Sequence, residues 1–242
     1  MSEQAAHFVT THWSQIVAAG GSDSSQARSS LEQLCRIYWY PLYAFARRSG
    51  KGPEDAQDLT QGFFARLLEK NYLSDVDREK GRFRTFLISA FKHFLAKEWR
   101  KEQSLKRGGD QVFVPIDAAD AESRYGFEPA EETTPERIFE RRWALMVLER
   151  TLATLRAEYE DAGKGAIFDH LKGIITAGRT EMPYAELAAE MKLTEGAVKV
   201  AAHRMRQRYR ETLRRQIAET VGSEAEVDAE LRNLMAALRN TL

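Results

Sequence analysis

The stretch from residue 182 to residue 215 constrains the fold most strongly, because its apolar residues recur at helical spacing on both sides of one short break. Pro183 suits the first turn of a helix, where its missing N–H would lack a partner anyway. Thr194, just after the break, can cap a second helix by accepting a hydrogen bond from an unpaired backbone N–H. The second helix has one apolar face, formed by Val198, Ala201, Ala202, Met205 and Tyr209. A short helix, a tight turn and a longer helix predict a helix-turn-helix.

The charges of the second helix are strongly one-sided. Between residues 192 and 215 there are eight basic residues and two acidic ones. Every amphipathic helix has a solvated polar face, but a face meant only for solvent usually balances its charges. The surplus of positive charge favours binding to phosphates, with the second helix entering the DNA major groove N-terminus first.

The whole chain carries no net charge, so a nucleic-acid site must come from local segregation of charge. It has 242 residues, 43% of them hydrophobic, which suits one large or two small soluble domains. The single cysteine fits a reducing cytoplasm. We expect no signal peptide and no membrane span. The five histidines lack metal-ligand spacing, so we expect no metal and no cofactor.

The first half of the chain contains a second basic region, between residues 78 and 107. It has ten basic and three acidic residues, interleaved with aromatic ones. Cations that follow the backbone and rings that stack on bases suit single-stranded nucleic acid. Most of its phenylalanines fit a helical core better than a binding site, whereas Phe83 and Trp99 are less easily assigned to the core.

An acidic, proline-containing stretch with little periodicity separates the two basic regions. Apolar residues recur at helical spacing in the other segments, and none has a clear strand pattern, so we expect an all-α protein with no strands. The predicted parts are a helical domain at 1–107, an acidic linker at 108–137, a helix-turn-helix domain at 138–221 and an acidic amphipathic C-terminal tail at 222–242.

Three segments in order carry a resemblance to a known family. They read YWYPLYAFARR, PEDAQDLTQGFFARLLEK and KGRFRTFLISAFKHFLAKEWRK. Together they resemble region 2 of bacterial RNA polymerase sigma factors. The later segment LAAEMKLTEGAVKVAAHRMRQRYR resembles region 4 of the same proteins. The resemblance covers roughly residues 30–105 and 140–216, and the two-domain layout is similar to the extracytoplasmic-function (ECF) group.

The resemblance implies three sets of site residues. Binding of core polymerase, through the clamp helices of the β′ subunit, would involve Asp55, Asp58, Gln61 and Arg66. Melting and reading of the minus-ten element would involve Arg82, Phe83, Arg84, Lys92, His93, Lys97, Trp99 and Arg100. Reading of the minus-thirty-five element in duplex DNA would involve Thr194, Glu195, Gly196, Lys199, Val200, His203, Arg204 and Arg208.

The implied partners are core RNA polymerase, including its β subunit, and promoter DNA. The acidic linker would run through the polymerase toward its active-site and RNA-exit channels. An anti-sigma factor is left open as a further partner. The family often has a glutamate after the glutamine of the polymerase-binding helix, whereas this chain has Gly62, which puts one polar contact in doubt.

Two other classes of protein compete with this interpretation. A helix-turn-helix transcriptional repressor with a helical sensor domain would bind a palindrome as a dimer and would not need core polymerase. A helical enzyme is disfavoured, because the sequence has no phosphate-binding glycine loop, no metal cluster and no nucleophile beside a base. The carboxylates of Asp55 and Asp58 suit the positive end of a helix dipole better than catalysis.

Overall fold

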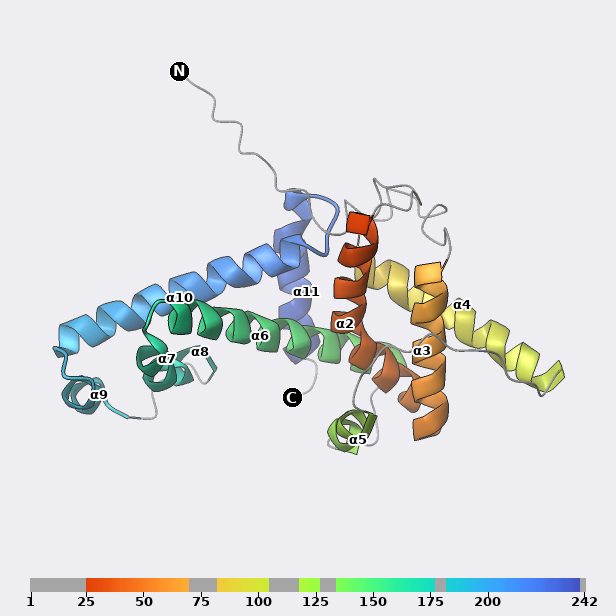
Figure 1. The fold of residues 1–242 in the computed structure, drawn as a ribbon, viewed down its shortest axis with the longest axis horizontal. Coiled ribbons are helices and arrows are strands. Elements are labelled where there is room, and N and C mark those ends of the chain that lie inside the picture. The colour runs from red at the N-terminus through yellow and green to blue at the C-terminus, as the bar shows by residue number, and fades with distance from the viewer. Residues whose placement is uncertain (1–24, 70–81, 105–117, 127–133, 177–181, 240–242) are drawn as a thin grey trace, which may run out of the picture. The chain divides into compact units, whose positions relative to one another are not determined.

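The structure is a computed structural model, and it describes residues 25–69, 82–104, 118–126, 134–176 and 182–239 (Figure 1). In these ranges the regular structure is helical, apart from one isolated antiparallel bridge between Arg82 and Val221. The all-α fold class is confirmed. The helices in chain order are α2 (Ser25–Arg48), α3 (Pro53–Glu69), α4 (Phe83–Ser104), α5 (Ala118–Gly126), α6 (Pro135–Asp161), α7 (Gly165–Leu171), α8 (Gly173–Thr176), α9 (Tyr184–Glu190), α10 (Glu195–Ala218), the 3-10 helix η2 (Glu224–Glu226) and α11 (Val227–Arg239).

The contacts divide the chain into two compact units, residues 1–145 with 218–242, and residues 146–217. The bounds of these units differ from those of the predicted domains, since residues 138–145 and 218–242 belong to the first unit. The predicted C-terminal tail is grouped with the first unit, and its Val227 and Leu234 are buried. The predicted linker is also partly regular structure, since it contains α5 and the start of α6; much of the remainder lies outside the described residues.

The first unit has an aromatic core. α2, α3 and α4 pack together, and Pro41 lies inside α2 without ending it. The ring of Phe63 on α3 makes edge-on contacts with Phe91 and Phe94 of α4, at centroid distances of 5.1 and 5.6 Å. Edge-on ring pairs of this kind add about 0.5–1.5 kcal/mol beyond their buried area.

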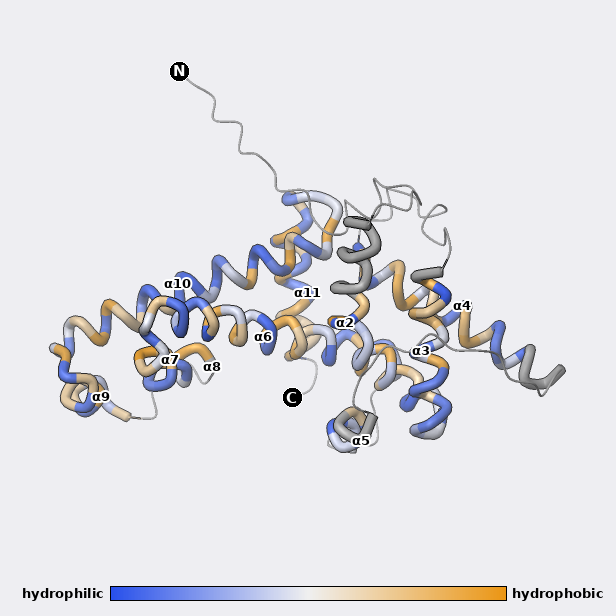
Figure 2. Tube along the Cα trace, viewed as in Figure 1, coloured by the Kyte–Doolittle hydropathy of each residue, from blue (hydrophilic) through white to orange (hydrophobic). Residues whose placement is uncertain are grey.

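The second unit is built around the turn-linked pair α9 and α10. Its core joins residues from α6, α7, α8, α9 and α10: Leu155, Phe168, Leu171, Ile174, Leu187, Ala188, Val198, Ala202 and Met205. Hydrophilic and hydrophobic residues alternate along α10 in the hydropathy view (Figure 2). One face of α10 therefore lies in the core while the other is left for solvent or a ligand.

Candidate nucleic-acid interface

The start of α10 is fixed by a local cap. The hydroxyl oxygen of Thr194 accepts a hydrogen bond from the backbone N–H of Ala197 at 3.2 Å, as the sequence predicts for an N-cap. Glu195 follows in the first turn, where its charge matches the positive end of the helix dipole. The chain enters this cap through Lys192, whose φ of 53° lies in the left-handed region. The tight turn of the predicted helix-turn-helix is therefore present.

The predicted minus-thirty-five residues lie on the exposed side of α10, with one partial exception. Val200 is 49% exposed, and a Cβ added to Gly196 would meet no atom within 4 Å. Arg208 is only half-exposed. The exposed residues are Thr194, Glu195, Gly196, Lys199, Val200, His203 and Arg204. The first turns of α10 thus present a continuous surface with little steric bulk at its start, which suits close approach to base edges.

Lys199, the central cation of this surface, is already paired within α10. Its ammonium nitrogen lies 2.6 Å from a carboxylate oxygen of Glu195 and 6.0 Å from the ring centre of Tyr184. The hydrogen bond to Glu195 raises the pKa of Lys199, so the side chain is charged at neutral pH. An exposed i,i+4 ion pair contributes little to stability, so Lys199 can exchange Glu195 for a base or a phosphate at little cost.

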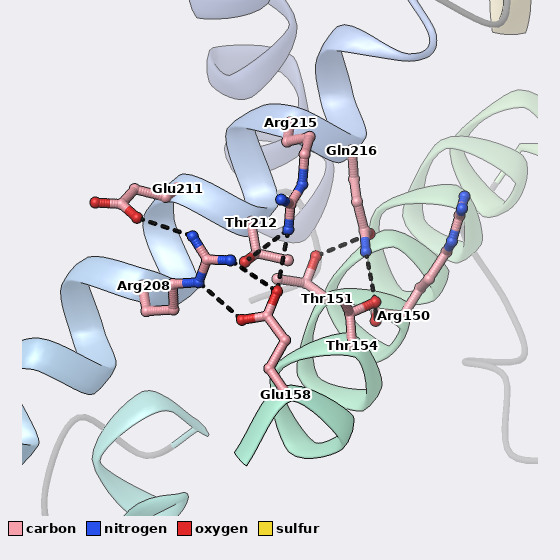
Figure 3. A network of polar contacts seen from close by, with 9 residues as sticks. All are labelled: Arg150, Thr151, Thr154, Glu158, Arg208, Glu211, Thr212, Arg215 and Gln216. Carbon is pink, nitrogen blue, oxygen red and sulfur yellow. Dashed lines mark hydrogen bonds and ion pairs between the residues drawn. The ribbon is translucent and has the colours of Figure 1, made fainter. Parts of the chain in front are cut away.

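Arg208 is held by another helix of the second unit, α6 (Figure 3). Its guanidinium donates to both carboxylate oxygens of Glu158, at 2.7 and 2.9 Å, and Arg215 donates to Glu158 at 3.3 Å. The hydrogen bond from Arg208 lowers the pKa of Glu158. A two-pronged contact of this kind fixes the arginine. Arg208 is therefore occupied in joining α6 to α10, which the sequence did not predict.

A second polar chain joins α6 and α10 next to this pair. The Thr151 hydroxyl donates to the amide oxygen of Gln216 at 3.1 Å, and the Gln216 amide nitrogen donates to the Thr154 hydroxyl at 3.1 Å. Thr151 and Gln216 are buried. Sequence reasoning missed them; the only available signal was polar residues at positions where helical spacing predicts a buried face.

The predicted minus-ten residues fall into two groups on and next to α4. The first group is exposed: Lys92, His93, Lys97, Trp99 and Arg100. Trp99 is the most notable, because a large ring that is 57% exposed is available for stacking on a base. Lys92 also pairs with Glu136, at 2.5 Å. This exposed group keeps the combination of cations and one ring that the sequence predicts.

The second group, at the start of α4, is largely covered. Phe83 is fully buried and Arg84 is 6% exposed, so neither can contact DNA in this conformation. The Arg84 guanidinium forms ion pairs with Glu230 of α11 and Glu140 of α6, and it lies 4.5 Å above the ring of Trp143. Arg82 also pairs with Glu230, at 3.2 Å. Burial raises the pKa of Glu140, against the lowering effect of Arg84.

The predicted polymerase-binding residues lie on α3. Asp55 and Asp58 are exposed and Arg66 is partly exposed, whereas Gln61 is only 4% exposed and faces the core. In this structure Gln61 therefore cannot contact a partner directly. A Cβ at Gly62 would meet only the edge of the Phe94 ring at 3.7 Å, an ordinary contact, so space does not require glycine there.

Residues 38–105 match the family model described as Sigma-70 region 2, a segment that runs from α2 to the end of α4. The match identifies a DNA-binding protein of transcription initiation. The match over this segment supports a sigma-70 family sigma factor, a class of protein that acts in promoter recognition. No curated protein and no solved structure matches the chain.

None of the described helices is both long and apolar enough to cross a membrane. In the same ranges no three histidine, cysteine or acidic side chains come together in a way that could hold a metal ion.

Proposed function

We propose that this protein is a cytoplasmic, non-enzymatic sigma factor of the ECF group that binds core RNA polymerase, melts promoter DNA at the minus-ten element and reads the minus-thirty-five element as duplex. The observation that carries the proposal is the region 2 match over residues 38–105. A chain of 242 residues is consistent with the small ECF group.

Core polymerase is proposed to bind along the exposed side of α3. Asp55 and Asp58 are free of the core and stand on the first turns of that helix. Their carboxylates would attract a basic surface on the β′ clamp helices, and the pairing would be weakened by salt. Arg66, which lies later on the same helix, is proposed to take part in this contact. The β subunit is proposed as a further partner.

The minus-ten element is proposed to bind α4. Trp99 offers a ring for stacking, and His93, Lys97 and Arg100 can follow the backbone of one DNA strand. A flipped base that stacks on a ring offsets the cost of unstacking, which is a few kcal/mol.

The minus-thirty-five element is proposed to bind the first turns of α10, where Lys199 and His203 can reach base edges. This part rests on the helix-turn-helix geometry, because α9 and α10 lie outside the residues that match the family model.

The test is promoter-dependent run-off transcription with purified core polymerase. Transcripts that appear only when this protein is added would support the proposal. Asp58→Lys should abolish co-purification with core enzyme, whereas the charge-conserving Asp58→Glu should retain it. A repressor of the helix-turn-helix class would instead bind duplex DNA without core polymerase and would give no added transcript.

A further inference from the structure

We propose that the C-terminal segment, residues 220–239, is an intramolecular partner that covers the start of α4 and must be released before Arg82 and Arg84 can bind single-stranded DNA. This inference rests on the proposed function of α4. It adds an internal competitor for the DNA site, formed by a part of the chain that lies outside the matched region 2 segment.

The backbone contact at the start of α4 is the first line of support. The N–H of Phe83 donates to the carbonyl oxygen of Thr220 at 3.2 Å, and Arg82 and Val221 form an antiparallel bridge. The first N–H groups of a helix have no partner within it. The C-terminal segment therefore occupies a donor at the helix N-terminus that would otherwise be available to an anion.

The charge of Glu230 is the second line of support. Its carboxylate is fully buried and binds the guanidinium of Arg84 through both Nε and Nη2, with Arg82 at 3.2 Å. A carboxylate and a phosphate are both oxyanions that accept two parallel hydrogen bonds from arginine. Glu230 thus takes the place at Arg84 that a DNA phosphate would take.

The segment is also a continuous helical piece with its own cap. The Ser223 side chain and the Glu226 carboxylate form a capping box that starts η2, and α11 follows directly. Its attachment to the first unit combines the ion pairs of Glu230 with the buried side chains of Val221, Val227 and Leu234. A closed form that predominates lowers the apparent DNA affinity in proportion to the open fraction.

A disulfide lock tests the proposal in the full chain. In an antiparallel ladder the hydrogen bond from Phe83 N–H to Thr220 marks Arg82 and Val221 as a non-hydrogen-bonded pair, whose Cα atoms lie about 4.5 Å apart. That separation allows a disulfide. The variant is Arg82→Cys/Val221→Cys, and mass spectrometry follows the formation of the bond. The single native cysteine, Cys35, is buried.

The readout is fluorescence anisotropy of a labelled single-stranded oligodeoxynucleotide of mixed sequence, with the protein bound to core polymerase. We expect the oxidised form to bind about tenfold more weakly than the reduced form of the same variant. The reduced form controls for the loss of Arg82, and the unsubstituted protein with and without reductant controls for Cys35.

A second variant opens the contact instead of locking it. Glu230→Gln should bind the same oligonucleotide severalfold more tightly than the unsubstituted protein, because the competing charge is removed. Glu224→Gln, an exposed acid on the same segment, removes one charge without opening the contact and should leave the affinity unchanged. Circular dichroism of both variants checks that their helices are kept.

Three results would overturn the proposal: equal affinity of the oxidised and reduced forms, failure of the disulfide to form, or equal affinity of Glu230→Gln and Glu224→Gln. Failure of the proposed function is separate from all of these. It would appear as an unsubstituted protein that gives no promoter-dependent transcript with core polymerase.

Discussion

Arg84 is the residue whose environment differs most from its sequence context. It stands in a basic stretch, yet its side chain is buried, lies over Trp143 and is neutralised by acids from two other helices. A buried ion pair is costly to assemble, but removing one partner is costlier still, because the other charge is left without compensation. Arg84 therefore acts mainly in the stability of the first unit while the C-terminal segment is in place.

Arg84→Met is expected to lower the free energy of unfolding by about 3 kcal/mol, at the low end for a broken buried pair because Arg82 remains near Glu230. Arg84→Met/Glu230→Met should recover roughly half of that loss, since the buried carboxylate is also removed. Urea denaturation of the unsubstituted protein, Arg84→Met, Glu230→Met and the double variant measures both effects. A double variant as unstable as the sum of its single variants would contradict the coupling.

Glu158 allows a prediction about pH. Its folded-state pKa is lowered, so the stabilisation it provides is present above its unfolded-state pKa of about 4.3 and is lost as the pH falls through the folded value. Glu158→Gln should therefore lower stability by roughly 0.5–1 kcal/mol at neutral pH, and the difference should close in acid. Glu149→Gln, exposed on the same helix, is the matched control. A difference that persists unchanged in acid would contradict the assignment.

At the scale of the element, α10 begins with a cap at Thr194, follows a residue in the left-handed region and has one exposed face. Lys192 precedes the cap in the left-handed region, where a side chain costs about 1–2 kcal/mol. Its side chain is exposed, so packing does not explain this choice of residue.

Lys192→Gly should accordingly be more stable than Lys192→Ala by about 1 kcal/mol, because only glycine adopts this conformation freely. Both variants remove the same charge, so the comparison isolates the backbone. Thermal unfolding gives the difference. Equal melting temperatures would show that the turn relaxes without cost.

The exposed face of α10 yields a prediction about specificity. Lys199→Ala should change the selected upstream motif, since a base-edge contact contributes about 1–3 kcal/mol of discrimination. Arg204→Ala should weaken binding to all sequences and flatten its salt dependence. Arg204 is the better phosphate candidate than Arg208, because Arg208 is held by Glu158. Selection from random duplexes with holoenzyme measures the motif, and binding titrations at several salt concentrations measure the salt dependence. An unchanged motif for Lys199→Ala would contradict the docking.

At the scale of the whole molecule, the first unit is discontinuous in sequence and the second is not. The core of the first unit needs residues far beyond its region 2 segment. Tyr38 stacks on Phe139 at a centroid distance of 6.3 Å, and Arg84 needs Glu230. The core cluster of the second unit lies wholly within residues 155–205.

A fragment of residues 1–107 should therefore unfold without cooperativity, whereas a fragment of residues 146–217 should keep a cooperative transition. The physical reason is that the first fragment lacks Phe139, Trp143 and Glu230, which leaves apolar surface and the Arg84 charge uncovered. Urea titrations followed by circular dichroism compare the two. A cooperative transition for residues 1–107 would show that the region 2 segment folds without its distant partners.

Local patterns were enough to predict several parts of this protein. The helix period, the cap at Thr194, the turn before it and the exposed cations of α10 all depend on residues a few positions apart, where sequence spacing fixes geometry. The same holds for the exposed carboxylates on the first turns of α3. The family resemblance also came from local motifs, and the region 2 match confirms its first half.

Long-range contacts decided the rest. Arg208 meets an acid 50 residues away, and Arg84 meets one 146 residues away. A basic stretch reads the same in sequence whether its cations face solvent, DNA or a buried carboxylate. Only the packed structure distinguishes these cases, because the burial and the partners of a charge depend on which distant helix returns to cover it.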